Sequence, residues 1–155
     1  MVNVYFLDSS ALVKRYVAET GSDWIHTVTH LTAGNSLVIA RITWVEALGA
    51  LARRQREGDL SPEDIQKAIQ LFRYDLDTQY RVVELDIPLT ETAGALITRH
   101  PLRAYDAVQL ASALRVQAEL TRTKAPPLRF LVADDRLAAI AKAEGLRTEN
   151  PNKHP

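Results

Sequence analysis

Short apolar runs alternate with longer segments of helical periodicity along this chain, and that alternation constrains the fold more than any other feature. Runs rich in strand-forming residues lie at 2–7, 37–40, 81–85 and 129–132. Segments with apolar residues three or four positions apart lie between and after them, at 9–17, 21–31, 42–56, 61–77, 90–98, 103–119 and 134–144. Short buried strands separated by helices are typical of a parallel sheet covered on both faces. The sequence therefore predicts an α/β fold, with a mainly parallel sheet of four or five strands flanked by helices in three layers.

The length of the chain fits one domain and not two. Its 155 residues lie within the usual range for a single domain, and no repeat, low-complexity segment or internal linker divides them. We expect residues 1–149 to form the domain and residues 150–155 to form a flexible C-terminal tail.

Composition removes several kinds of site. Because cysteine is absent, the chain has no disulfide framework, thiolate metal site or cysteine nucleophile. Lys plus Arg and Asp plus Glu both number 19, so the net charge is zero. Any contact with RNA must then come from a local basic patch or from a metal ion. No export signal and no apolar stretch approaching the roughly 20 residues of a membrane span is visible. We therefore expect a cytoplasmic protein without a membrane partner.

Four carboxylates stand at positions where a site could form. Asp8 and Asp134 directly follow predicted strands, and in open α/β sheets sites form at the carboxyl ends of strands. Glu46 lies within the helix that follows the second strand, and Asp106 lies near the start of a long helix. Each has an ordinary explanation as well: a helix cap for Asp8 and Asp134, a first-turn acid for Asp106, and a water-exposed helix edge for Glu46.

The arrangement of the four acids carries more weight than any one of them. Carboxylates that share a cleft repel each other unless cations neutralise them, and hard oxygen ligands suit Mg²⁺ or Mn²⁺. The sequence predicts one acidic, metal-binding pocket. Asp134 is preferred over its neighbour Asp135, because Leu137 and Ala141 place Asp134 on the helix face that packs against the sheet.

Four segments resemble the PIN-domain ribonucleases, and within them the VapC toxins of toxin–antitoxin pairs. They are Tyr5-Phe6-Leu7-Asp8-Ser9-Ser10-Ala11-Leu12-Val13-Lys14, Thr43-Trp44-Val45-Glu46, Tyr105-Asp106-Ala107-Val108-Gln109-Leu110-Ala111 and Ala133-Asp134-Asp135-Arg136-Leu137. The resemblance covers almost the whole chain and implies a single PIN-like nuclease domain with Mg²⁺ or Mn²⁺ as cofactor. It also implies a homodimer that cuts RNA and is inhibited by a cognate antitoxin. Family members often carry Ser or Thr two residues before the last acid, where this chain has Val132.

The expected mechanism gives all four acids a catalytic role. Asp8, Glu46 and Asp106 are expected to be the main metal ligands, direct or through water. Asp134 is expected to complete the pocket and orient the attacking water. Candidates for contact with the RNA substrate are Ser10, Lys14, Arg15 and Arg103. Trp44 and Tyr105 are expected to pack in the core rather than stack on bases.

The sequence also admits two other functions. A phosphohydrolase with Asp8 as covalent nucleophile would need a second acid two residues on, where Ser10 stands. A non-catalytic interaction module would carry a degenerate pocket, whereas this sequence retains all four acids.

Overall fold

Five parallel strands form one sheet in the computed structural model, which describes residues 2–155. The strands stand in the order β3-β2-β1-β4-β5, so that the first strand of the chain lies at the centre. Their bounds are β1 Val4–Leu7, β2 Ser36–Ala40, β3 Tyr80–Val83, β4 Arg129–Leu131 and β5 Arg147–Glu149. The predicted α/β class and parallel sheet are confirmed, and β5 is an edge strand that the apolar pattern did not assign.

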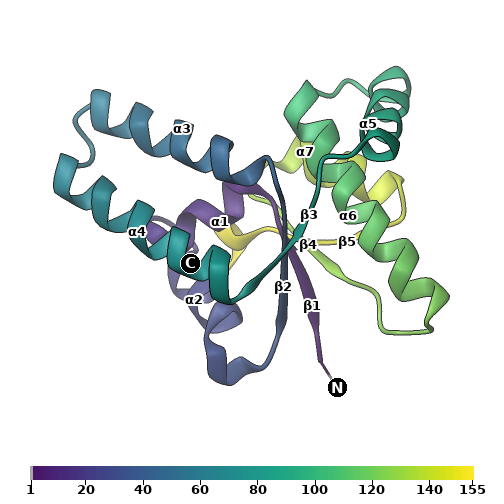
Figure 1. Ribbon diagram of the computed structural model, residues 1–155, viewed down its shortest axis with the longest axis horizontal. Coiled ribbons are helices and arrows are strands. Elements are labelled where there is room, and N and C mark those ends of the chain that lie inside the picture. The colour runs from purple at the N-terminus through teal and green to yellow at the C-terminus, as the bar shows by residue number, and fades with distance from the viewer. Residues whose placement is uncertain (1) are drawn as a thin grey trace.

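Seven α-helices cover the two faces of the sheet. As Figure 1 shows, α1 to α4 lie on one side and α5 to α7 lie on the other, which makes the predicted three layers. Their bounds are α1 Ser9–Tyr16, α2 Ser22–Thr29, α3 Thr43–Arg56, α4 Pro62–Thr78, α5 Ile87–Arg99, α6 Ala104–Arg122 and α7 Asp135–Ala143. Among residues 2–155, no helix is both long and apolar enough to cross a membrane.

Alternating side chains of the strands build two cores. In β1, Phe6 packs toward α5, α6 and α7, whereas its neighbours Tyr5 and Leu7 pack toward α1 to α4. Both faces of the strands are therefore buried, which explains why they read as unbroken apolar runs in the sequence. The two cores hold the sheet rigidly between its helices and fix the ends of the strands.

The last residues of the chain differ from the flexible tail that we expected. A short 3₁₀ helix at Pro151–Lys153 follows β5, and the side chain of Pro151 is buried. The His154 ring stacks on Trp24 of α2 with ring centroids 4.2 Å apart. Pro151 packs directly against Gly21 at the start of α2. Only glycine allows this contact, because a Cβ at position 21 would lie 2.5 Å from the carbonyl oxygen of Pro151.

Candidate active site

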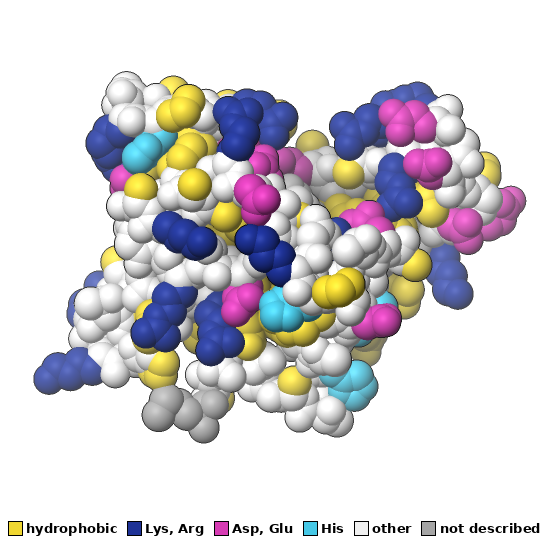
Figure 2. Space-filling view, turned by 180° about the vertical axis from the view of Figure 1, so that it is seen from behind, with side chains coloured by type: hydrophobic (Ala, Val, Ile, Leu, Met, Phe, Trp, Pro, Cys, Tyr) yellow, Lys and Arg dark blue, Asp and Glu magenta, His cyan; other side chains and the backbone are white. Residues whose placement is uncertain are grey.

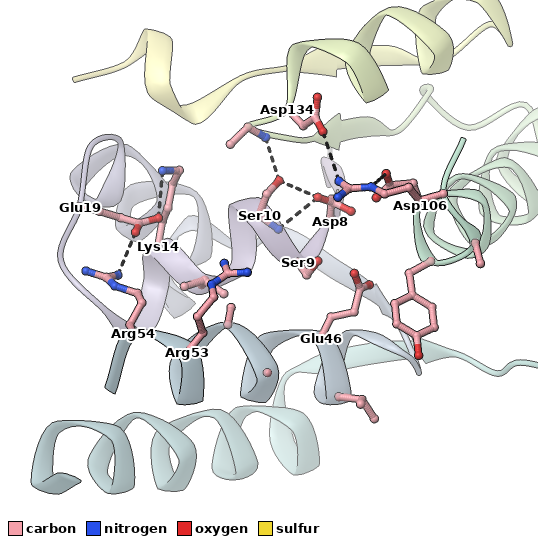
Figure 3. Close-up of a pocket in the computed structure, with 18 of the residues that line it drawn as sticks. Asp8, Ser9, Ser10, Lys14, Glu19, Glu46, Arg53, Arg54, Asp106 and Asp134 are labelled. Carbon is pink, nitrogen blue, oxygen red and sulfur yellow. Dashed lines mark hydrogen bonds and ion pairs between the residues drawn. The ribbon is translucent and has the colours of Figure 1, made fainter. Parts of the chain in front are cut away.

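The four predicted acids line one pocket of about 900 Å³ at the carboxyl edge of the sheet. Asp8 follows β1 and Asp134 follows shortly after β4, and these two strands pair directly through Phe6 and Phe130. Glu46 comes from α3 and Asp106 from the first turn of α6. Figure 3 shows the four side chains arranged around the same cavity. The four acids, which come from four different segments of the chain, therefore line a common pocket.

Asp8 is the most buried acid of the pocket, with only 4% of its surface exposed. Its Oδ2 accepts hydrogen bonds from the Ser10 backbone N–H at 3.1 Å and from the Ser10 hydroxyl at 2.6 Å, which caps α1. Its Oδ1 is buried and has no hydrogen-bond partner among residues 2–155. The pKa of Asp8 is raised to about 7, mainly by burial; the hydrogen bonds from Ser10 lower it, and the nearby Glu46 and Asp106 carboxylates add a smaller rise. A buried oxygen of this kind calls for a proton or a cation.

Ser10 lines the pocket and is hydrogen-bonded to Asp8. Besides donating to Asp8, its hydroxyl oxygen accepts a hydrogen bond from the Ala133 N–H at 3.0 Å. The hydroxyl therefore ties the start of α1 to the loop between β4 and α7. The Asp8 carboxylate is held between these two elements, and we assign Ser10 a supporting role.

Gln109 is a site residue that the sequence analysis did not single out. It lies on α6, is fully buried, and its Nε2 donates to Glu46 Oε1 at 2.7 Å and to Thr43 Oγ1 at 2.8 Å. Burial is the main cause that raises the pKa of Glu46, and the hydrogen bond from Gln109 opposes it. The available signal was a polar side chain three residues after Asp106 on an otherwise apolar helix face.

Arg103 stands between two acids at the mouth of the pocket. Its Nε lies 3.3 Å from Asp106 Oδ2, and its guanidinium lies 3.9 Å from Asp134 Oδ2. The side chain is 80% exposed. Arg103 therefore acts as a counterion of the acids while remaining open to a ligand.

Lys14 and Arg15 are neighbours on α1 but take different directions. Lys14 lines the pocket, where its buried ammonium group lies 3.0 Å from Glu19 Oε1. Arg15 lies outside the pocket and donates to the Tyr80 hydroxyl at 2.8 Å and to Gln79 Oε1 at 2.6 Å. The structure thus gives Arg15 a packing role between α1 and β3, and not the predicted contact with substrate.

The pocket fits a divalent cation by the chemistry of its donors. Its four carboxylates offer hard oxygen ligands, and the partnerless Oδ1 of Asp8 lies buried among them. Within residues 2–155, however, no three acidic or histidine side chains converge as a ready metal-binding group. Arg103 lies beside two of the acids and offsets part of their charge.

Fold and pocket together define an α/β protein with four carboxylates in one pocket at the carboxyl edge of its sheet. A family model of the PIN domain matches residues 5–143. Two relatives from Mycobacterium tuberculosis strains, named ribonuclease VapC45 and ribonuclease VapC49, are each 37% identical over 145 residues. The match covers 93% of this chain and 92% of each relative. The chain therefore belongs to the PIN-domain family and, within it, to the VapC group.

Solved structures share the fold at low sequence identity. VapBC2 from Rickettsia felis, bound to a DNA fragment from its promoter, gives a TM-score of 0.64 at 16% identity and covers 95% of this chain and 98% of that one. FitAcB from Neisseria gonorrhoeae gives a TM-score of 0.60 at 14% identity, and the match covers 96% of this chain and 97% of FitAcB. PAE2754 from Pyrobaculum aerophilum gives a TM-score of 0.63 at 21% identity, and the match covers 99% of this chain and 92% of PAE2754.

Proposed function

We propose that this chain is a divalent-metal-dependent endoribonuclease. The observation that carries the proposal is Asp8, whose Oδ1 is buried without a partner in a pocket shared with three other carboxylates. The two VapC relatives, 37% identical to this chain, bear the name ribonuclease. An enzyme of this kind hydrolyses phosphodiester bonds in RNA.

The chain's own side chains supply the framework for that reaction. Asp8, Glu46 and Asp106 would hold Mg²⁺ or Mn²⁺, and Asp134 would orient the attacking water. When bound, the metal lowers the pKa of a water and offsets charge on the phosphate oxygens. Ser10 holds Asp8 in place, and Gln109 does the same for Glu46. Arg103 is exposed at the mouth of the pocket, where it can bind a phosphate oxygen.

The substitution Asp8→Asn tests the proposal directly. Asn keeps an oxygen for the Ser10 N–H and removes the charge, so the fold is retained. We expect RNA cleavage to fall by a factor of order 10² or more, as happens when a transition-state electrostatic contact is lost. EDTA should abolish the activity of the wild type, and Mg²⁺ or Mn²⁺ should restore it. Full cleavage in EDTA, or undiminished cleavage by Asp8→Asn, would rule out a metal-dependent reaction at this pocket.

We further propose that the chain is the toxin of a toxin–antitoxin pair, a homodimer that acts in the cytoplasm. Support comes from the VapC relatives and from fold neighbours that are toxin–antitoxin complexes. A cognate antitoxin would inhibit it by placing an Arg or Lys among the carboxylates, where charge-assisted hydrogen bonds are strong. Expression of the chain alone should arrest bacterial growth, whereas expression of Asp8→Asn should not.

The structure favours neither alternative function. Two residues after Asp8, where an aspartate-based phosphohydrolase would carry its second acid, the Ser10 hydroxyl is engaged by Asp8 and Ala133. In a non-catalytic interaction module, the buried Oδ1 of Asp8 would cost stability without serving a reaction. An aspartyl-phosphate trapped at Asp8 would revive the first alternative.

A further inference from the structure

The active-site pocket continues past the acids along α3 and ends among cations. The wall that α3 contributes runs from Glu46 through Gly49 and Ala50 to Arg53. Gly49 and Ala50 lie three and four positions after Glu46, and Arg53 lies four and three positions after them, so the four residues share one face of the helix. Arg53 lies seven positions after Glu46, which is about 10 Å along the helix axis. Figure 3 shows Arg53 and Glu46 rising from α3 on the same side.

The cations at this end of the pocket differ in how they are engaged. Glu19 binds both Lys14 and Arg54, each at 3.0 Å, and so holds these two side chains in place. Arg53 is exposed and makes no ion pair with a carboxylate of residues 2–155. Its charge is therefore available to an anion inside the pocket, about two helical turns along α3 from Glu46. Figure 2 shows Lys and Arg mixed with Asp and Glu over the face it draws, so a local cation of this kind matters more than net charge.

The pocket lining beside Asp106 and Glu46 includes an exposed aromatic ring and an exposed apolar side chain. Tyr105 precedes Asp106 and is 53% exposed, and Val45 precedes Glu46 and is 57% exposed. We expected Tyr105 to pack in the core, and the structure places it at the rim instead. Trp44 does pack, because Arg73 covers its ring at 3.9 Å and Phe72 lies 5.1 Å away. Tyr105 is thus the aromatic ring that the pocket offers to a base.

We propose that single-stranded RNA lies along α3 with one base on Tyr105 and a phosphate on Arg53, on either side of the phosphate that is cut. This inference rests on the proposed ribonuclease function. A half-exposed aromatic ring binds a base by stacking, which requires a base free of its duplex partners. Gly49 and Ala50 keep the helix surface low between the acids and Arg53, so a sugar-phosphate backbone fits there. A Cβ added at Gly49 would meet no atom within 4 Å.

Binding of a fluorescent single-stranded RNA to the Asp8→Asn protein tests both contacts. Adding Arg53→Ala should weaken binding about tenfold, as loss of a hydrogen bond to a charged group does. It should also lower the salt dependence of binding by about 0.7 in the log–log slope, the value for one single-strand phosphate contact. Tyr105→Ala should weaken binding about tenfold and leave the salt slope unchanged. Arg122→Ala is the matched control, because Arg122 lies at the end of α6, outside the pocket-lining residues.

Two further measurements separate the path of the RNA from general charge effects. Gly49→Leu adds bulk to the open stretch of α3 and raises helix propensity. It should therefore increase thermal stability while weakening RNA binding. Cleavage of a long oligonucleotide by Arg53→Ala should fall at least fivefold more than cleavage of a dinucleoside monophosphate, which has no second phosphate.

The outcomes also distinguish this inference from the proposed function. A wild-type protein that fails to cut any RNA with Mg²⁺ or Mn²⁺ would refute the proposed function. Normal cleavage together with unchanged binding in Arg53→Ala and Tyr105→Ala would refute only the path along α3. The path would also be refuted if both variants lost affinity for a co-expressed inhibitor protein while binding RNA like the wild type.

Discussion

The carboxylates of the pocket divide their two oxygens between different partners. Asp8 uses Oδ2 to cap α1 and leaves Oδ1 free, and Asp134 uses Oδ1 to cap α7 and leaves Oδ2 near Arg103. Glu46 accepts a hydrogen bond from Gln109 at Oε1. A helix cap and a metal ligand are therefore compatible in one side chain. Each cap also fixes the direction of the oxygen that remains for the ligand.

Asp8 should make the stability of the protein depend on pH. Its pKa is raised from 3.8 to about 7, mainly by burial. Between these values the folded chain holds a proton that the unfolded chain has lost, so the free energy of unfolding falls as pH rises. The fall should amount to a few kcal/mol at most, on the order of 1.4 kcal/mol per unit of pKa shift. Urea unfolding from pH 4 to pH 8 measures it.

Asp8→Asn should flatten this dependence, because Asn does not titrate. Asp135→Asn, on the same edge of the sheet, should retain it. At pH 8, Mg²⁺ should stabilise the wild type and have much less effect on Asp8→Asn, since binding to the folded state alone adds stability. A wild type whose stability is constant from pH 4 to pH 7 would contradict the buried, partnerless state of Asp8.

Gln109 should act on catalysis through Glu46. Gln109→Leu keeps the side-chain volume close and removes the hydrogen bond that lowers the pKa of Glu46. We expect kcat to fall about tenfold and the acidic limb of the pH–rate profile to move to higher pH. Ser112→Ala is the control, because Ser112 is equally buried on α6 but bonds only to the Val108 carbonyl. A loss of activity without any shift of the profile would indicate a packing role instead.

Sequence patterns indicated the four acids but not the polar residues that share the pocket with them or bind them. Asp8 and Asp134 stand at the ends of apolar strands, where a charged residue is conspicuous. Gln109 and Arg53 lie within helices, where polar side chains are ordinary, and only tertiary contacts reveal their partners. Lys14 and Arg15 look alike in the sequence. One residue of helix turns the side chain by about 100°, which is enough to send one into the pocket and the other away from it.

At the scale of elements, the position of α7 places Asp134 in the pocket and its neighbour Asp135 outside it. Asp134 lines the pocket as the N-cap of α7, whereas Asp135 is 75% exposed at its side chain and bonds Asn150 Nδ2 at 3.0 Å. Asp134→Asn should keep the cap, since Asn caps as well as Asp, and should weaken Mn²⁺ binding and cleavage. Asp135→Asn should change stability by no more than about 0.5 kcal/mol and leave activity near normal. Mn²⁺ titration of both variants checks this, and loss of metal in the variant at 135 alone would contradict the assignment.

The strands and helices were largely predictable, and the exceptions have local causes. Buried strands are predictable from their apolar runs. β5, however, is a three-residue edge strand with the sequence Arg-Thr-Glu, a polar pattern that is typical of a loop. Helix α5 begins at Ile87 rather than at residue 90, because Asp86 caps it and Pro88 fits its first turn. The order of the strands follows from long-range pairing, which local patterns do not encode.

At the scale of the whole molecule, we expect a homodimer in solution. Light scattering at micromolar concentration should give twice the 17.3 kDa mass of the chain. Leu85, Ile87 and Ile97 are large apolar residues left exposed near β3 and on α5, at 43%, 78% and 42%. Ile87→Asp should weaken the dimer without unfolding the chain, because an acid suits the first turn of a helix. A wild-type monomer under these conditions would contradict the proposal.

The central place of β1 has a consequence for how the protein is made. Its neighbour β4 lies near the end of the chain, and the Ala133 N–H that binds Ser10 is 123 residues downstream. Chains leave the ribosome N-terminus first, at roughly 5–20 residues per second. Asp8, Glu46 and Asp106 therefore emerge before the strand and loop that complete their pocket. We therefore expect a growing chain to be inactive toward RNA until residues 129–134 have emerged and folded against β1.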